Sequence, residues 1–203
     1  FWSGNEGRMV LANDLTLIDD GLMEGGMGSS SLDGEGVPRQ TQVLVENGRL
    51  VGSMWSTRDS AQMVAEGRIE HAQSTGSASR GSHQSPPYTG CSDMILKSSK
   101  GGKSRDDLIS HMENGYIVHS VMGAHTANPT SGDFSVTTST ILKVVDGQIA
   151  GPIKQAGLSG NIAKALSNDV ILGDRSILQE SYSTGGMHIP DVLVMDGFRI
   201  NPA

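Results

Sequence analysis

Short runs of apolar and β-branched residues alternate with glycine-containing turns along most of the chain. Two segments, 41–54 (TQVLVENGRLVGSM) and 140–153 (TILKVVDGQIAGPI), each place two such runs around an Asn-Gly or Asp-Gly pair, at 47–48 and 146–147. These pairs favour the two-residue type I′ turn, because both central residues of that turn need a positive φ. The sequence therefore predicts two β-hairpins. Their similarity also allows a weak internal duplication, although any two hairpins look alike at this level.

Five further runs of mostly apolar residues have the length of single strands. They are Leu15–Ile18, Ser92–Leu96, Tyr116–Met122, Phe134–Thr138 and Val192–Met195. Short apolar runs bounded by turn residues are typical of β-strands. The Ser-, Gly- and Pro-rich stretch 74–90 is predicted to be a loop. Irregular segments of that length are uncommon inside a compact domain and are often functional.

Two short helices are predicted from cap and stop signals. The first covers 57–65, with Ser56 as its N-cap and Gly67 as its stop signal. The second covers about 161–167 and follows a turn predicted over 157–160, where two glycines stand close together.

A third helix, which starts after Ser104, has the best-marked ends. Asp107 stands three residues beyond Ser104 as the partner of a capping box, and Gly115 supplies a left-handed residue at the far end. The residues predicted to form its buried stripe are Leu108, Ile109 and Met112.

The balance of these elements predicts the fold class. Strands outnumber helices and no β-α-β alternation is present, so we expect an α+β fold, mainly antiparallel β-sheet with about three short helices. The chain has 27 glycines among 203 residues, and they stand at turn positions between apolar runs. This composition indicates many short elements joined by tight turns.

Charge and cysteine content disfavour several kinds of protein. The chain carries 15 Lys and Arg against 22 Asp and Glu, a net charge of −7, which argues against nucleic-acid binding because phosphate contacts need a basic face. No apolar run approaches the ~20 residues that span a bilayer, so no membrane partner is expected. A single cysteine, Cys91, excludes an internal disulfide and favours the cytoplasm. The first residue is Phe1, which suggests a fragment of a longer protein.

The histidines give only a weak metal-site pattern. No two of the six are spaced as the paired zinc ligands of a helical His-Glu-x-x-His motif, which needs its histidines four residues apart. His119 and His125 are the nearest pair, and a site built from them with Asp133 is the alternative to ordinary imidazoles. Cys91 has no basic cluster or helix N-terminus beside it in the sequence, so an inert thiol is the favoured interpretation.

Two acidic clusters flank a Gly-, Ser- and Met-rich segment. Asp19-Asp20 precedes it, and Asp33 and Glu35 follow it. Paired carboxylates can bind a cation or serve in acid-base chemistry. The alternative is Asx-type turns and solvated charge.

The order of segments resembles the TldD/PmbA family, whose members are also called modulators of DNA gyrase. Residues 14–48 show a strand ending in Asp-Asp, a Gly-Ser stretch, an Asp-x-Glu-Gly-x-Pro motif and a hairpin with Asn-Gly. Later matches include STGS at 74–77, TSGDFS at 130–135 and LSGN at 158–161. The motif and turn residues that carry the resemblance are Asp33, Glu35, Gly48, Gly132, Asp133, Gly147 and Gly160.

This resemblance covers nearly the whole chain and implies a domain organisation. Residues 1–203 would be the C-terminal domain of the TldD/PmbA fold, with the N-terminal domain absent. Family members pair as dimers, so a homodimer or a heterodimer with a TldD-type protease is implied. The TldD-type partner is a zinc peptidase with a His-Glu-x-x-x-His helix and a zinc-binding Cys near its C-terminus.

The corresponding C-terminal segment of this chain departs from that pattern. Residues 180–186 (ESYSTGG) contain no Cys, and 188–194 (HIPDVLV) is similar to the PmbA (TldE) branch, which lacks the metal ligands. Since catalytic zinc takes about three protein ligands, the resemblance implies a chain with no catalytic residue and no cofactor of its own, and zinc is expected in the TldD-type partner.

The expected function is that of a non-catalytic subunit of a zinc metalloprotease complex that processes unfolded peptides. Such peptides would bind by adding a strand to an exposed sheet edge. Two alternatives stay open. One is an active metallopeptidase with the atypical site His119, His125 and Asp133, and the other is a structural dimerisation module.

Overall fold

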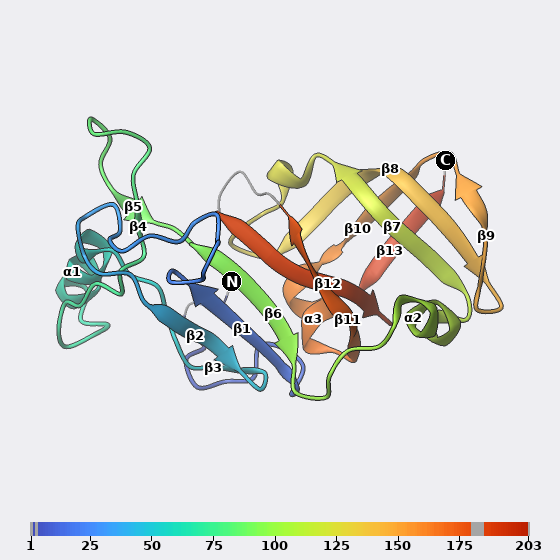
Figure 1. Cartoon of the computed structure of the whole chain (residues 1–203), viewed down its shortest axis with the longest axis horizontal. Coiled ribbons are helices and arrows are strands. Elements are labelled where there is room, and N and C mark those ends of the chain that lie inside the picture. Colours follow the sequence, from blue (N-terminus) through green and yellow to red (C-terminus); the bar gives the residue numbers. More distant parts are fainter. Residues whose placement is uncertain (1, 3, 180–184, 203) are drawn as a thin grey trace.

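The computed structural model describes residues 2, 4–179 and 185–202, which form an elongated molecule built on two β-sheets (Figure 1). One sheet has six strands and the other five, and β4 (Ala78–Ser79) and β5 (Tyr88–Thr89) form a separate two-stranded ladder inside the predicted loop. The predicted α+β class, mainly antiparallel with three short α-helices, is confirmed. Within these ranges, no helix combines the length and the apolar character needed to cross a bilayer.

The six-stranded sheet combines the first half of the chain with two strands from its C-terminal part. Across the sheet the order is β11 (Val170–Gln179), β12 (Gly186–Val194), β6 (Asp93–Ser98), β1 (Leu15–Asp20), β2 (Thr41–Glu46) and β3 (Arg49–Leu50). Neighbouring strands are antiparallel except β12 and β6, which run parallel where Gly186 lies opposite Asp93. This parallel contact places the C-terminal part of the chain beside the start of β6.

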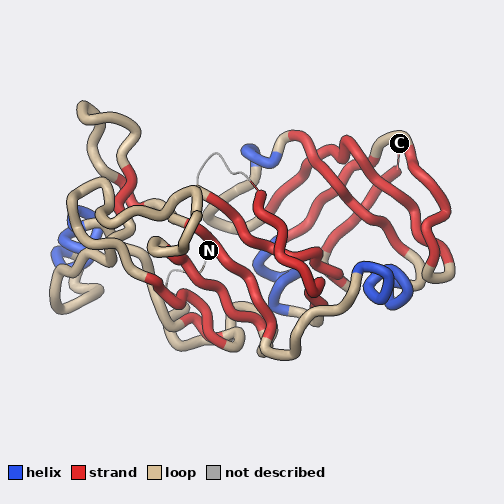
Figure 2. Tube along the Cα trace, in the orientation of Figure 1, coloured by secondary structure: helices blue, strands red, loops and turns tan. Residues whose placement is uncertain are grey.

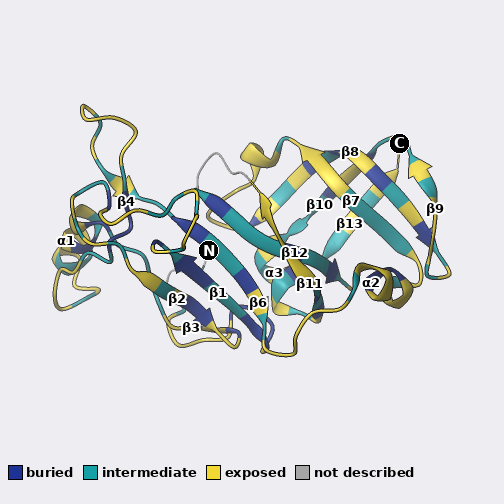
Figure 3. Cartoon of the chain, in the orientation of Figure 1, coloured by how far each residue is buried: buried dark blue, intermediate teal, exposed yellow. Residues whose placement is uncertain are grey.

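The main hydrophobic core packs against this sheet. Leu15 in β1 and Val45 in β2 are fully buried, and Figure 3 shows buried positions on both of these strands. The other buried members of the core are Val10, Leu11, Ala12, Leu50, Leu96, Val170 and Leu172. Removal of this apolar surface from water, at about 25 cal/mol per Å², is the main force that holds the sheet in place.

The five-stranded sheet is organised around one long strand, β8 (Asp133–Val145). β7 (Gly115–Met122) pairs with β8, β10 (Ala156–Asn161) pairs with its first part and β9 (Gln148–Ile153) with its last part, and β13 (Phe198–Pro202) pairs with β10. The strand predicted over 134–138 and the first strand of the predicted hairpin 140–153 are therefore one continuous strand.

Both predicted hairpin turns are confirmed. The φ angles are 47° at Asn47 and 79° at Gly48, and 50° at Asp146 and 71° at Gly147, so both central residues are positive as a type I′ turn requires. The first turn joins β2 to β3 and the second joins β8 to β9. The hairpins lie in different sheets, and their suggested duplication stays a prediction.

The three predicted helices are present at α1 (Thr57–Ala65), α2 (Arg105–Met112) and α3 (Ile162–Ser167), and a short 3-10 turn covers Ala124–Thr126 (Figure 2). Ser56, Ser104 and Asn161 are their N-caps, and each accepts a hydrogen bond from the backbone N–H three residues on. Gly67, with φ +70°, follows the end of α1 as predicted.

The predicted end of α2 at Gly115 is wrong. The positive φ is at Glu113, 56°, and Gly115 already begins β7. The cause is a tertiary contact, because the Glu113 carbonyl accepts a hydrogen bond of 2.7 Å from the N–H of Gly147 in the distant hairpin turn. That contact satisfies a terminal helix carbonyl which the local sequence leaves open.

The turn predicted over 157–160 is also wrong, because these residues lie in β10. A Cβ at Gly160 would lie 2.5 Å from the carbonyl oxygen of Gly197, so the glycine permits close approach of the backbone at the start of β13.

The sequence patterns do not predict the strands β11 and β13 or the first part of β12.

Candidate functional site

The acidic motif segment 19–39 folds onto the start of β6, where a buried carboxylate organises it. Asp93 has no exposed surface. Its Oδ1 accepts a hydrogen bond of 3.0 Å from the N–H of Met27, and its Oδ2 accepts bonds from the N–H of Gly28 (2.9 Å) and the hydroxyl of Ser29 (3.0 Å). Three hydrogen bonds offset much of the cost of burying a charge. Asp93 therefore fixes the Gly- and Ser-rich segment to the sheet.

The same carboxylate reaches β12. His188 Nε2 lies 3.3 Å from Asp93 Oδ1, and the imidazole is 21% exposed. Glycines on both sides leave room for this pair, since a Cβ at Gly26 would lie 2.5 Å from Asp93 Oδ2 and a Cβ at Gly186 would lie 2.6 Å from Oδ1. The site thus joins the motif segment, β6 and β12 through one side chain.

Asp19, at the end of β1, is a second buried carboxylate in this region. It is 1% exposed, and its Oδ1 accepts a 2.6 Å hydrogen bond from the N–H of Ser92. Burial is the main cause that raises the pKa of Asp19 to about 6, and the charges of Asp93 and Asp20 act in the same direction. The Ser92 N–H and the guanidinium of Arg39 act against this rise.

Asp33 and Glu35 organise the rest of the segment. Asp33 Oδ1 accepts hydrogen bonds from the N–H groups of Glu35 (2.8 Å) and Val37 (2.9 Å), which forms an Asx turn, and its Oδ2 accepts one from the N–H of Ala78 at 3.0 Å. Glu35 Oε2 accepts a 2.7 Å bond from the N–H of Thr57, the first residue of α1. A carboxylate at a helix N-terminus stabilises the helix.

The other motif residues serve turns and strand contacts outside this region. Gly48 and Gly147 form the hairpin turns, and Gly132 (φ 79°) precedes β8. Asp133 is exposed and accepts hydrogen bonds from the hydroxyl of Ser131 (2.7 Å) and the amide of Asn161 (2.8 Å), which lower the pKa of its carboxyl group. Gly132, Asp133 and Gly147 belong to the five-stranded sheet or its loops, whereas Gly48 lies in the β2–β3 turn of the six-stranded sheet, away from Asp33 and Glu35.

The alternative zinc ligands are not gathered into a ligand group. His119 is exposed on β7, His125 is exposed in the short 3-10 turn, and Asp133 starts β8. Across residues 2, 4–179 and 185–202, no three His, Cys, Asp or Glu side chains are placed to hold a metal ion. The described donors therefore do not fit a catalytic zinc ion, which takes about three protein ligands.

Cys91 lies nearer to the C-terminal segment than its position in the sequence suggests. The carbonyl of the adjacent Ser92 accepts hydrogen bonds from the N–H groups of Gly185 (2.9 Å) and Gly186 (3.3 Å). Burial, assisted by the charge of Asp19, raises the pKa of the Cys91 thiol to about 11. The thiol therefore stays protonated at neutral pH. Residues 180–184, which include most of the segment aligned with the zinc-binding Cys, lie outside the described residues.

The sequence singled out Asp33, Glu35 and Asp19 but not Asp93 or His188. One signal for Asp93 was present, since an ionisable residue stands directly before the apolar run 94–96 of a predicted strand. A charge at such a position is rarely buried without a specific partner. His188 gave no comparable signal, because its partner is 95 residues away in the sequence.

Comparison with known proteins gives consistent matches. A family model described as the PmbA/TldA metallopeptidase C-terminal domain matches residues 1–201. A metalloprotease TldD homolog from Haemophilus influenzae is 30% identical over 178 residues, which cover 87% of this chain and 35% of that protein. An uncharacterised protein from Methanocaldococcus jannaschii is 34% identical over 171 residues, 84% of this chain and 38% of that protein.

A solved structure shows the same fold. The crystal structure of TldE from Thermococcus kodakarensis matches with a TM-score of 0.79 at 24% sequence identity, covering 99% of this chain and 42% of that chain. This chain thus spans less than half the length of each of these three proteins.

Proposed function

The chain belongs to the PmbA/TldD metallopeptidase family, and from this premise we propose that it is a non-catalytic, TldE-like subunit of a metalloprotease complex that processes unfolded peptides. Residues 1–203 would act as the C-terminal domain of that subunit, in the cytoplasm. A TldD-type partner would supply the zinc ion and the groups that cleave the peptide.

The observation that carries this proposal is the composition of the segment that the resemblance aligns with the zinc-binding Cys. Residues 180–186 contain no Cys, and Cys91 is the single cysteine of the chain. A zinc-binding Cys acts as a thiolate, and burial beside Asp19 raises the pKa of the Cys91 thiol to about 11, so its deprotonation costs more than that of an ordinary Cys. Both features support placing the zinc ion in a partner.

A free strand edge beside Asp93 and His188 supports the peptide-binding part of the proposal. In the second part of β11, Leu178 pairs with His188 of β12 on one side. Its other side has no strand partner among the described residues, and Ile177 and Leu178 are 47% and 48% exposed. Unpaired backbone groups at such an edge can accept an extended peptide as a further strand. An unfolded peptide offers its backbone groups in this way along its whole length.

The test uses the purified chain alone and mixed with a TldD-type protease. We expect less than stoichiometric zinc in the chain by elemental analysis, no cleavage of an unfolded casein-like peptide by the chain alone, and cleavage by the mixture. One tightly held zinc ion per chain together with cleavage by the chain alone would contradict the proposal.

A substitution separates the proposal from the active-peptidase alternative. His125→Ala is expected to leave cleavage by the mixture unchanged, because His125 is exposed and no metal group forms around it in the described structure. If the variant instead abolished cleavage, the atypical site at His119, His125 and Asp133 would be favoured.

A further inference from the structure

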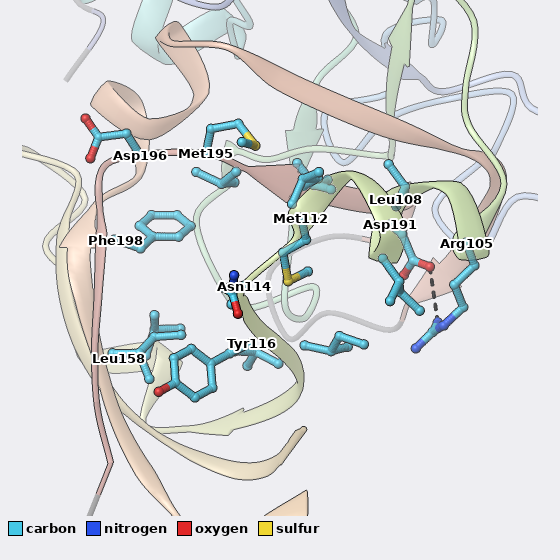
Figure 4. Close-up of a pocket in the computed structure, with 18 residues that line it drawn as sticks. Arg105, Leu108, Met112, Asn114, Tyr116, Leu158, Asp191, Met195, Asp196 and Phe198 are labelled. Carbon is cyan, nitrogen blue, oxygen red and sulfur yellow. Dashed lines mark hydrogen bonds and ion pairs between the residues drawn. The ribbon is translucent and has the colours of Figure 1, made fainter. Parts of the chain in front are cut away.

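A pocket of about 450 Å³ lies between the two sheets, next to α2 (Figure 4). Its lining comes from α2, from β7, β10 and β13 of the five-stranded sheet, and from β12 with the turn that leads to β13. This volume lies within the range of pockets that bind small molecules or single side chains. None of the residues of the motif segment lines it.

The walls of the pocket are mainly apolar. Residues that contribute apolar surface are Leu108, Met112, Leu158, Met195 and Phe198 (Figure 4). The ring of Phe198 is held by an edge-to-face contact with Phe134, with ring centroids 5.3 Å apart. Such a contact fixes the ring orientation, so this wall is preorganised for an apolar group.

Two neutral polar side chains with spare hydrogen-bonding capacity stand in the pocket. Asn114 projects into its middle, and Tyr116 lies below it (Figure 4). The Tyr116 hydroxyl has no hydrogen-bond partner among the described residues, and the Asn114 amide makes one long contact, 3.4 Å, from the N–H of Asp146 to its Oδ1. At another part of the rim, Arg105 and Asp191 form an ion pair of 3.1 Å and neutralise each other. Asp196, the other acidic residue of the lining, accepts a 2.7 Å hydrogen bond from the N–H of Gly197 and points away from Asn114 and Tyr116 (Figure 4). The polar groups in the middle of the pocket are therefore neutral and suit a neutral ligand.

We propose that this pocket binds a large apolar side chain of a peptide, such as Phe, together with a neutral peptide group beside it. The apolar walls would take the side chain, and Asn114 and Tyr116 would bond the peptide group. β7 contributes 115–118 to the pocket and pairs only with β8 among the described strands, so an extended chain has access to its other edge. The inference rests on the proposed contact with peptides, and it adds a preference for apolar residues.

The test is a titration of the whole chain with N-acetyl-L-phenylalaninamide, followed by NMR of ¹³C-methyl-labelled methionines. Met112 and Met195 line the pocket, whereas Met9 and Met27 are exposed elsewhere. We expect saturable shifts of the Met112 and Met195 signals and little change at Met9 and Met27. N-acetylglycinamide, which lacks the side chain, is the matched ligand control and should give no saturable shift.

Two tyrosine variants test the polar contact. Tyr116→Phe removes the unpartnered hydroxyl and should weaken binding about fivefold, the effect of one lost hydrogen bond. Tyr88→Phe makes the same change at an exposed tyrosine in β5 and should leave binding unchanged. Leu158→Ala, which enlarges the pocket, should weaken binding as well, and its methyl spectrum shows whether the variant is folded.

Absence of saturable shifts at Met112 and Met195, or equal shifts at all exposed methionines, would overturn the proposal. Equal binding by Tyr116→Phe and the unchanged chain would overturn the role of the hydroxyl. The titration needs no protease, so its failure leaves the subunit role intact. Conversely, saturable binding together with no partner-dependent cleavage would count against the subunit role and not against the pocket.

Discussion

At the scale of single residues, the carboxyl group of Asp19 couples the stability of the fold to pH. Its pKa is about 6 in the folded chain, against 3.8 for an ordinary Asp. The folded state therefore binds this proton more tightly than the unfolded state does. Ionisation of Asp19 therefore lowers the free energy of unfolding. This loss of stability is absent below about pH 4, grows between pH 4 and 6, and is complete above that range, where it reaches about 2–3 kcal/mol.

Asp19→Asn should remove this loss of stability. The Asn side-chain oxygen can still accept the hydrogen bond from Ser92, and no charge is buried. We expect the free energy of unfolding to rise by about 2 kcal/mol at pH 8 and to stay unchanged at pH 4, as measured by urea unfolding at both values. Asp106→Asn, at an exposed position in α2, is the control. A loss of stability at pH 8 would mean that attraction to Arg39 outweighs the cost of burial.

At the scale of elements, two glycines of β10 make a matched pair. A Cβ at Gly160 would lie 2.5 Å from the Gly197 carbonyl oxygen and 2.8 Å from the ring of Phe198, so the backbone must shift. A Cβ at Gly157 would have its nearest neighbour, the carbonyl oxygen of Asn201, at 4.0 Å. Neither glycine has a positive φ, so backbone strain does not distinguish the two positions. They differ in the space that a side chain would find.

Gly160→Ala should therefore lower the free energy of unfolding by about 2 kcal/mol, a typical cost of overpacking. Gly157→Ala should be neutral or slightly stabilising, because alanine reduces the freedom of the unfolded chain. Urea unfolding of both variants measures the difference. Similar losses in the two would show that strand propensity, and not the contact between β10 and β13, sets the cost.

The same strand shows why some elements were predictable and others were not. The turns at 47–48 and 146–147 and the cap at Ser104 depend on two to four adjacent residues, and they formed as predicted. Gly160 stands in a strand because it pairs with Phe134 in β8 and Phe198 in β13, both distant in the sequence, whereas its local pattern is typical of a turn. Tertiary contacts determine the secondary structure at this position, as they determine where α2 ends.

The candidate site shows the same difference between contacts that are local in the sequence and contacts that are distant in it. The Asp33 turn is encoded within five consecutive residues, since its Oδ1 accepts from Glu35 and Val37. The contact of Asp93 with Met27 and Gly28 spans more than sixty residues, and that with His188 spans 95. Sequence patterns report neighbours along the chain, so they identified the motif but not the buried carboxylate that holds it.

At the scale of the whole molecule, α3 joins the two sheets. The N–H of Ile162 donates to the carbonyl of Gly132, which precedes β8, at 2.9 Å. The carbonyl of Leu166 accepts from the N–H of Ala12, in the core of the six-stranded sheet, at 2.8 Å. Between them, Ala165 is fully buried, and a Cβ at Gly197 would lie 3.1 Å from it. A disturbance at Ala165 therefore reaches both sheets.

If α3 makes the sheets one cooperative unit, Ala165→Leu should destabilise both together. Overpacking at this position is expected to cost about 1–3 kcal/mol. The methyl signals of Met94 in β6 and Met122 in β7 report the two sheets separately during urea unfolding. We expect both native signals to disappear at one common, lowered urea concentration, since coincident transitions are the mark of two-state unfolding. Ala150→Leu, at an exposed position in β9, should leave that concentration unchanged. Separate midpoints for Met94 and Met122 would mean that each sheet unfolds by itself and that α3 only tethers them.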